Sequence, residues 1–247
     1  MDRMLYIAMS GAKETLLSQQ ATSNNLANAT TSGFVADYHQ FRSMPVFGEG
    51  QPTRVYAMSE RPSSDFAPGS MMMTGRDLDI AVSTGGWFAV QGKDGNEAYS
   101  RRGDLQIDPN GLVTTSNGLP IFGDGGPIAI PPADKITIGS DGTISIIPEG
   151  GDPTQLAVID RIKMVAPQYD QMEKGTDGLM RLKSGELAEA DVSQRLLQGV
   201  LEQSNVNSVK EMVNMIELQR RFEMQIKMMK TADEMANSAA SIMRPGG

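Results

Sequence analysis

The C-terminal segment at residues 201–242 contains neither glycine nor proline. From Met215 onward, residues at alternating steps of three and four form a series in which only Gln225 is polar. The members are Met215, Leu218, Phe222, Gln225, Met229, Ala232, Ala236, Ala239 and Met243. Apolar residues at this spacing lie along one side of an α-helix and are typical of a coiled-coil seam. The segment therefore predicts a long helix that needs a partner.

A second apolar set lies off this seam, because each residue turns a helix by about 100°. Its members are Met224, Met228, Met235 and Ile242. One neighbouring helix cannot cover both sets, so we expect several partner helices. The alternatives are core packing inside one domain and an ordinary coiled-coil dimer. Methionine favours assembly, because its flexible side chain adapts to neighbours that are not identical.

The overall composition excludes several kinds of protein. A chain of 247 residues can form one or two domains, and its net charge of −8 argues against a nucleic-acid surface. Without cysteine there is no disulfide, thiolate nucleophile or cysteine zinc site. We expect no membrane insertion and no cleaved signal peptide, because no apolar run has the required length.

The N-terminal part predicts a second helix at residues 4–29, with Leu5, Met9, Ala12 and Leu16 at steps of four, three and four. The second half of this helix is mostly polar, so the helix is marginal alone and could be ordered by the C-terminal helix. Gly33 stops it, and Phe34 offers an anchor. Residues 35–75 contain several prolines and predict an extended or small β module.

Short runs rich in valine, isoleucine and threonine follow, separated by turn sequences such as Asn110-Gly111 and Asp141-Gly142. The expected strands are at 78–82, 87–91, 98–101, 112–115, 128–130, 136–138, 143–147 and 156–165. We therefore predict an α+β fold in which paired, coiled-coil-like terminal helices carry an inserted, mostly antiparallel β domain. The expected divisions are 1–34, 35–75, 76–185 and 186–247.

Few residues suggest chemistry. His39 is the only histidine, which excludes a multi-histidine metal site, and no glycine spacing predicts a phosphate loop. Asp77 and Asp79 would share one face of a strand, as a catalytic carboxylate pair could, although acids at a strand edge are more often solvated. We expect no catalytic residue, no metal and no cofactor.

Three stretches, taken together, resemble the bacterial flagellar axial proteins, which are the rod and hook subunits. The sequence SNNLANATTSGF at residues 23–34 is similar to their N-terminal pattern ANNLANxxTxGF, with Ser23 in place of alanine. RDLDIAV at 76–82, GWFAVQ at 86–91, YSR at 99–101 and GLVT at 111–114 are similar to their central β domain, with Trp87 where phenylalanine is common. LEQSNV at 201–206, EMV at 211–213 and TAD at 231–233 are similar to their C-terminal signature.

The resemblance implies a structural protein of the flagellar basal body without enzymatic activity. It implies export by the flagellar type III apparatus without a cleaved signal, and polymerisation in the periplasm into the shaft between motor and hook. The implied partners are the export apparatus, adjacent rod subunits and further copies of this chain. Within the family, the opening residues are most similar to the proximal rod subunits, and the distal rod subunits are the nearest alternative.

We expect the terminal helices to supply the assembly interface, with Asn205 as a helix N-cap. The expected interface residues are Leu5, Met9, Leu16, Asn25, Leu26, Asn28, Phe34, Asn205, Val206, Met212, Met215, Ile216, Leu218, Phe222, Met229 and Met235. Two competing functions stay open on the residues alone. One is a cell-wall glycosidase that uses Asp77 and Asp79, and the other is a binding module with a coiled-coil oligomerisation tail.

Overall fold

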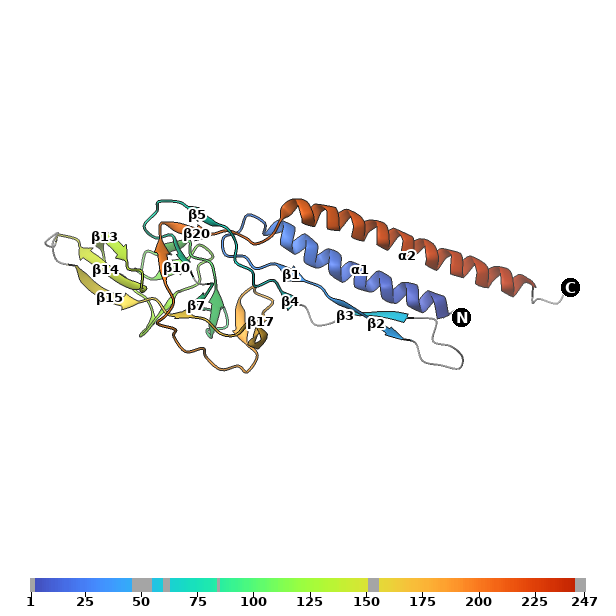
Figure 1. Cartoon of the computed structure of the whole chain (residues 1–247), viewed down its shortest axis with the longest axis horizontal. Helices are drawn as coiled ribbons and strands as arrows, with labels where there is room; N and C mark the ends of the chain where they lie inside the picture. Colours follow the sequence, from blue (N-terminus) through green and yellow to red (C-terminus); the bar gives the residue numbers. More distant parts are fainter. Residues whose placement is uncertain (1–2, 46–54, 60–62, 84, 151–155, 243–247) are drawn as a thin grey trace. The chain divides into compact units, whose positions relative to one another are not determined.

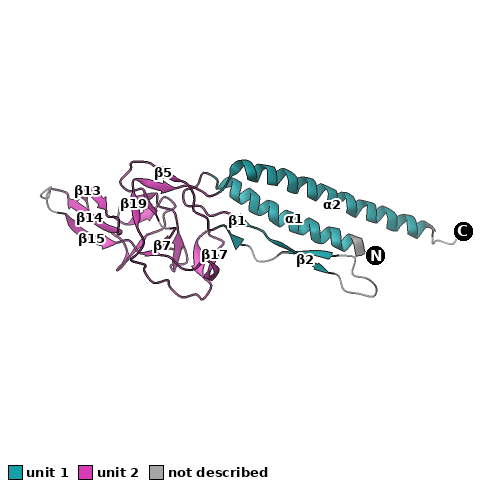
Figure 2. Cartoon of the chain, viewed as in Figure 1, with its two compact units in different colours: residues 1–29, 37–65, 206–247 teal, residues 30–36, 66–205 magenta. Residues whose placement is uncertain are grey.

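The computed structural model describes residues 3–45, 55–59, 63–83, 85–150 and 156–242. The chain forms two compact units (Figure 2). Unit 1 contains Met1–Ala29, Asp37–Asp65 and Val206–Gly247, and unit 2 contains Thr30–Ala36 and Phe66–Asn205. Unit 2 is thus inserted between the segments of unit 1 along the sequence.

Unit 1 is built on two long helices, α1 (Arg3–Ala27) and α2 (Ser208–Ile242), which pack side by side (Figure 1). They run antiparallel, because Thr15 of α1 contacts Gln225 of α2 while Asn25 of α1 lies near Glu211. Two small ribbons complete the unit. β1 (Asp37–Tyr38) pairs with β4 (Ser63–Ser64), and β2 (Phe41–Pro45) pairs with β3 (Val55–Ser59), all antiparallel. β3 packs on α1, where Ser10 Oγ donates a hydrogen bond to the Ala57 carbonyl.

Unit 2 is antiparallel throughout. Its largest sheet has the strand order β16-β7-β8-β18-β17, and a second sheet has the order β13-β14-β15. The strands of these sheets are β7 (Trp87–Gln91), β8 (Glu97–Ser100), β13 (Ala133–Ile138), β14 (Thr143–Pro148), β15 (Ala157–Arg161), β16 (Met164–Val165), β17 (Met172–Lys174) and β18 (Met180–Leu182). A short 3-10 helix, η1 (Tyr169–Gln171), precedes β17.

Four strand pairs complete unit 2. β9 (Leu105–Ile107) pairs with β10 (Val113–Thr115), and β11 (Phe122–Gly123) pairs with β12 (Gly126–Pro127). The other two pairs join the end of the unit to its beginning along the sequence. β19 (Leu196–Gln198) pairs with β6 (Ile80–Val82), and β20 (Val200–Glu202) pairs with β5 (Met71–Met73).

Strand β7 separates the two hydrophobic clusters of this unit. Successive side chains of a strand point to opposite faces. Phe88 and Val90 therefore enter one cluster, while Trp87 and Ala89 enter the other. All four residues are buried, so the apolar run in the sequence reflects burial on both faces. Both clusters found among the described residues belong to unit 2.

The predicted fold class is confirmed: paired terminal helices accompany an inserted antiparallel β domain. The strand expected at 87–91 has these bounds, and those expected at 98–101, 112–115, 136–138 and 143–147 differ from β8, β10, β13 and β14 by a few residues at most. The run at 156–165 is split into β15 and β16. The expected strand at 128–130 is wrong, because only Ala129 there makes an isolated bridge, with Leu112.

The predicted start of the C-terminal helix is also wrong. Residues 200–202 form strand β20, and α2 begins only at Ser208. The absence of glycine and proline could not distinguish this strand from a helix, because its pairing partner lies far away at Met71–Met73. Asn205 is not the N-cap. Asn207 caps α2 instead, since its Oδ1 accepts a hydrogen bond from the backbone N–H of Lys210 at 3.0 Å.

Candidate assembly surface

The face of α1 that is buried is made of small and polar residues. Six of them follow one another at steps of three and four, namely Ala8, Ala12, Thr15, Ser18, Thr22 and Asn25, and Glu14 is also buried. The opposing seam of α2 is the one predicted from the sequence as far as Ala232, whereas Ala236 and Ala239 are exposed and Met243 lies outside the described residues. Ala232 is buried, and Met215, Leu218, Phe222, Gln225 and Met229 are half-buried. The large side chains of this pair therefore come mainly from α2.

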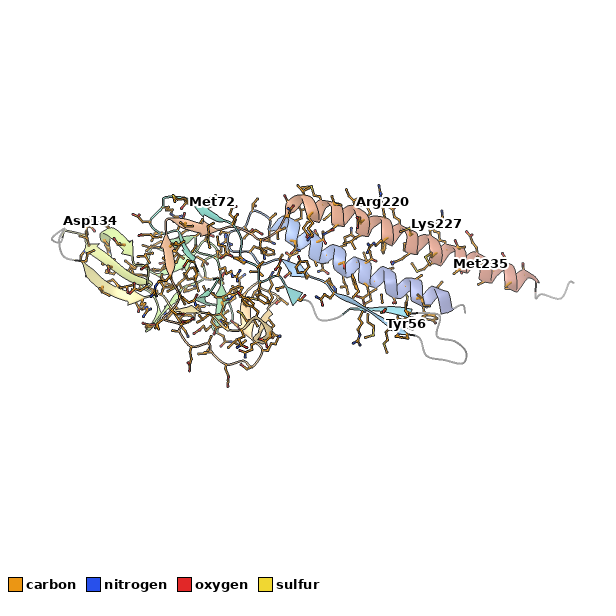
Figure 3. All side chains as sticks on the ribbon, viewed as in Figure 1. Tyr56, Met72, Asp134, Arg220, Lys227 and Met235 are labelled. Carbon is orange, nitrogen blue, oxygen red and sulfur yellow. The ribbon has the colours of Figure 1, made fainter. Side chains whose placement is uncertain are left out.

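Much of the large apolar surface of the two helices remains uncovered. Met9 and Leu16 of α1 are 53% and 49% exposed, although the sequence predicted them in the apolar stripe of that helix. On α2, Met212 is 50% exposed, Ile216 54% and Met235 61%. Figure 3 shows Met235 in the C-terminal half of α2. Exposed apolar side chains in such numbers on paired helices are typical of a surface that another protein covers.

The N-terminal signature has a structural role beside this surface. Asn25 is buried, its Nδ2 donates to the Asp37 carbonyl at 2.9 Å, and its Oδ1 accepts from the Asp37 N–H at 2.8 Å. Asn24 Nδ2 donates to the Asp37 carboxylate at 2.8 Å. Asn28 Nδ2 donates to the carbonyl and side-chain oxygens of Asn24. These contacts attach the chain that returns at Asp37 to the end of α1.

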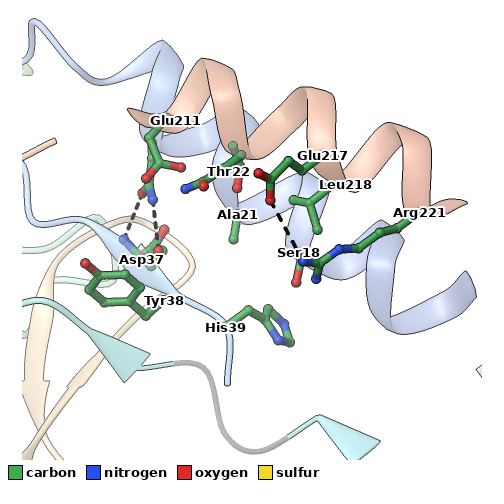
Figure 4. A pocket seen from close by; sticks show the side chains of 12 residues that line it. Ser18, Ala21, Thr22, Asp37, Tyr38, His39, Glu211, Glu217, Leu218 and Arg221 are labelled. Carbon is green, nitrogen blue, oxygen red and sulfur yellow. Dashed lines mark hydrogen bonds and ion pairs between the residues drawn. The ribbon is translucent and has the colours of Figure 1, made fainter. Parts of the chain in front are cut away.

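A polar hollow of about 210 Å³ lies between α1, α2 and the segment that contains β1. Ser18 and Thr22 of α1, Glu211 and Arg221 of α2, and His39 line it (Figure 4). The Arg221 guanidinium lies 3.8 Å from the Glu217 carboxylate on the exposed side of α2. The hollow is lined by one histidine, His39, by the carboxylates of Asp37, Glu211 and Glu217, and by the hydroxyls of Ser18 and Thr22.

Two of the predicted interface residues, Phe34 and Asn205, lie in unit 2, where their two segments are joined by hydrogen bonds. The Asn205 N–H donates to the Phe34 carbonyl at 3.3 Å, and Asn205 Oδ1 accepts from the Ala36 N–H at 2.8 Å. Lys174 Nζ lies 4.2 Å from the centroid of the Phe34 ring. Gly33, with φ of +63°, precedes this anchor, and a Cβ there would lie 2.4 Å from the Arg101 backbone. Only glycine fits at this position.

The remaining predicted residues also lie in unit 1. Leu5, Leu26, Asn28 and Val206 are half-buried. The predicted set is thus divided into residues between α1 and α2, residues exposed on these helices, these four half-buried residues of unit 1, and the Phe34 and Asn205 pair in unit 2.

Sequence reasoning missed a buried ion pair in unit 2. Arg101 Nη1 lies 3.3 Å from Glu202 Oε1, with both side chains almost fully buried, and the Arg101 guanidinium lies 4.4 Å from the centroid of the Trp87 ring. Burial raises the pKa of the Glu202 carboxyl, although hydrogen bonds from the Gly69 N–H and from Arg101 oppose this. Trp87, Arg101 and Glu202 all lie in motifs quoted above, but nothing in their spacing predicts that they meet.

The predicted carboxylate pair is not formed. Asp77 is exposed in a turn before β6, whereas Asp79 is buried and its Oδ1 lies 3.5 Å from Arg76 Nη1. The strand begins at Ile80, so the two acids do not share a strand face. Within the described ranges, no group of three or more histidine, cysteine or acidic residues could hold a metal ion. In the same ranges, no helix combines the length and apolar character needed to cross a bilayer.

The geometry defines a class of protein first: a subunit whose two chain ends form one helical pair with much of its apolar surface outward, and whose middle forms a β domain. Residues 5–34 match the family described as flagella basal body rod protein. Residues 81–146 match the flagellar hook protein FlgE/F/G D1 domain, and residues 197–242 match the flagellar basal body rod FlgEFG protein C-terminal family.

Curated relatives are similar over nearly the whole chain. The flagellar basal-body rod protein FlgF of Escherichia coli is 42% identical over 98% of this chain and 99% of its own length. FlgF of Caulobacter vibrioides is 32% identical over 97% of each chain. The flagellar basal-body rod protein FlgG of Bacillus subtilis is 29% identical over 98% of this chain and 99% of its own. The chain therefore belongs to the flagellar basal-body rod protein family. It is a structural protein rather than an enzyme, and the glycosidase alternative is wrong.

Proposed function

We propose that this chain is a subunit of the proximal segment of the flagellar rod. Identity of 32–42% to FlgF proteins, against 29–31% to FlgG proteins, supports the proximal assignment over the distal one. The partners in this proposal are further copies of the chain, adjacent rod subunits, and the flagellar export apparatus during secretion. The proposed location is the periplasmic rod, reached without a cleaved signal peptide.

The helical pair carries the proposal for assembly. α1 offers a small, polar face to α2, so much of the larger apolar surface is left for neighbouring subunits. Met9 and Leu16 on α1, with Met212, Ile216 and Met235 on α2, are the residues we propose for contacts between subunits. Burial of apolar area there would favour the polymer, and only the part that exceeds the loss of translational and side-chain freedom on association would appear as stability. Helices whose side chains interdigitate with those of neighbouring subunits would transmit torque along the shaft.

The other predicted interface residues have supporting roles in this proposal. Met215, Leu218, Phe222 and Met229 join α2 to α1, and Asn25, Leu26 and Asn28 belong to the end of α1. The division into polymerising ends (1–34 and 186–247), an intervening module (35–75) and a β domain (76–185) remains part of the proposal.

The substitution Ile216→Asp tests the assembly surface. It places a charge on an exposed apolar position, so the subunit should fold while assembly is lost. The variant is expressed in a strain that lacks FlgF and scored for swimming and for completed rods. The wild-type chain should restore both, and Ile216→Asp should restore neither.

The matched control is Asn237→Asp, which adds the same charge at an exposed polar position of the same helix, about six turns from Ile216 and on the side opposite Met235. It should restore swimming like the wild type. Full swimming with Ile216→Asp would exclude this surface from assembly. Rescue of a strain lacking FlgG, with none in the strain lacking FlgF, would assign the chain to the distal rod instead.

A further inference from the structure

The one polar residue in the α2 seam has a specific site on α1. Thr15 Oγ1 lies 3.3 Å from Gln225 Oε1 and 2.8 Å from the Gly11 carbonyl, so its single proton can be donated to either oxygen. Gly11 lies beside the same amide. A Cβ at Gly11 would be 2.8 Å from Gln225 Nε2, closer than carbon and nitrogen atoms approach without a shift. The amide therefore occupies the space that glycine leaves open.

This site occurs once along α1. Gly11 is the only glycine of α1. Toward the N-terminus, the adjoining buried position is Ala8, which carries a Cβ and offers no side-chain hydrogen bond. Toward the C-terminus, it is Ser18, which offers a hydroxyl but also carries a Cβ where Gly11 leaves space. Sliding α2 by one turn in either direction would therefore lose the space that admits the Gln225 amide. A polar residue at one seam position is known to set register and partner in helix pairs.

The seam of α2 could also pair with a second copy of itself. Its apolar residues follow the spacing of a coiled coil from Met215 to Ala239, and residues 233–241 are exposed in this structure. In a parallel pair of α2 helices, however, Gln225 would face Gln225 between Phe222 and Met229. The two amides could hydrogen-bond to each other, but a polar pair in an apolar seam costs stability relative to an apolar residue. On α1, the same amide meets the Thr15 hydroxyl and the space beside Gly11, so the α1 pair is favoured.

We propose that Gln225 is a specificity-determining residue. It selects α1 of the same chain, in one register, as the partner of the α2 seam, and it disfavours pairing with α2 of a second copy. This inference concerns pairing within one chain, and it holds or fails independently of the place of the chain in the rod.

The test uses Gln225→Leu in the full chain, which removes the amide and completes the apolar seam. Because the chain has no cysteine, Ala236→Cys introduces a single thiol at an exposed seam position. In a parallel α2 pair, two such thiols face each other and can form a disulfide. We expect Gln225→Leu to raise the disulfide-linked fraction several-fold, and to raise the mass measured by light scattering under reducing conditions.

The matched control is Gln219→Leu, the same chemical change on the same helix away from the seam. Gln219→Leu adds its leucine one turn from the exposed Ile216, so any association through the exposed apolar surface is at least as strong in this control. A higher linked fraction in Gln225→Leu than in Gln219→Leu therefore reports the seam. Gly11→Leu supplies an independent variant from α1: it fills the space of the amide, keeps Gln225, and should also raise the linked fraction.

Equal disulfide yield and equal mass for Gln225→Leu and Gln219→Leu would overturn the proposal. So would a loss of helix content in Gln225→Leu without dimers, because the amide would then stabilise the pair without selecting its partner. Circular dichroism of each variant distinguishes these results.

Discussion

At the scale of single residues, two asparagines of the sequence motifs hold distant backbone segments through their side-chain amides. Asn25 pairs with both backbone groups of Asp37, as a neighbouring strand would. Asn205 makes a comparable contact with the Ala36 N–H and also donates to the Ala67 carbonyl. Buried polar groups are costly unless hydrogen-bonded, so each amide needs the backbone that it contacts.

The substitution Asn25→Ala should destabilise unit 1 by about 1–3 kcal/mol, because it leaves backbone groups of Asp37 unpaired in a buried place. Urea unfolding followed by far-UV circular dichroism measures this loss. Asn24→Ala is the control, since Asn24 is exposed and donates to a carboxylate that water can also solvate. An equal effect of the two substitutions would show that the paired contact of Asn25 has no special weight.

At the scale of elements, the turns of unit 2 repeat one device. Asp94, Asp141, Asp177 and Asp191 each accept a hydrogen bond from the backbone N–H two residues later. Each of these four carboxyls also accepts a side-chain hydrogen bond, which lowers its pKa. The donors are, in the same order, Asn96, Thr143, Arg181 and Ser193. The ionised side chain is therefore the form that holds each turn.

Acid should weaken unit 2 through these turns. Because the four pKa values are lowered in the folded state, the unfolded chain binds more protons, and stability is lost as pH falls below the ordinary aspartate pKa of about 3.9. Glu202 acts in the opposite direction, since its pKa is raised. Urea midpoints measured by Trp87 fluorescence at about pH 5 and about pH 3 should fall on acidification.

Replacing Asp141 and Asp191 with asparagine should reduce that dependence on pH, because the amide oxygen still accepts the backbone hydrogen bond and does not titrate there. If the double variant kept the full acid sensitivity, these turns would not be its cause.

Sequence patterns predicted these elements unevenly. Strand β7 was found with its bounds, because a short apolar run between Gly86 and Gly92 leaves few alternatives. The seam of α2 was also found, since one period extends over several turns. The buried face of α1 was not. The sequence predicts burial of the large apolar residues Leu5, Met9 and Leu16. The structure instead buries Thr15, Ser18 and Thr22, because α2 supplies the apolar side chains of the helical pair. Such complementarity between distant segments is absent from either segment alone.

At the scale of the whole molecule, the two units differ in how much apolar surface each one buries in its own interior. Unit 2 contains both hydrophobic clusters found in the described part of the chain, with Trp87 fully buried. Unit 1 contains both α-helices, packed through small and polar residues with much apolar surface exposed. Less apolar burial means less stability for the isolated subunit.

We therefore expect the units to unfold separately. Far-UV circular dichroism reports mainly the helices of unit 1, and fluorescence of the single tryptophan, Trp87, reports unit 2. The circular dichroism midpoint in urea should fall below the fluorescence midpoint. Coincident midpoints for the two signals would mean that the helical pair and the β domain form one cooperative unit.

The contact between Thr15 and Gln225 joins residues 210 positions apart. Closing so long a loop in an open chain is slow, because the entropy of the loop must be lost before the contact is gained. Because α1 precedes α2 by about 180 residues, α1 is synthesised first and the face that receives α2 remains unmatched until α2 has been made. The small, polar side chains of that face offer little apolar surface through which a nascent chain could aggregate in the meantime.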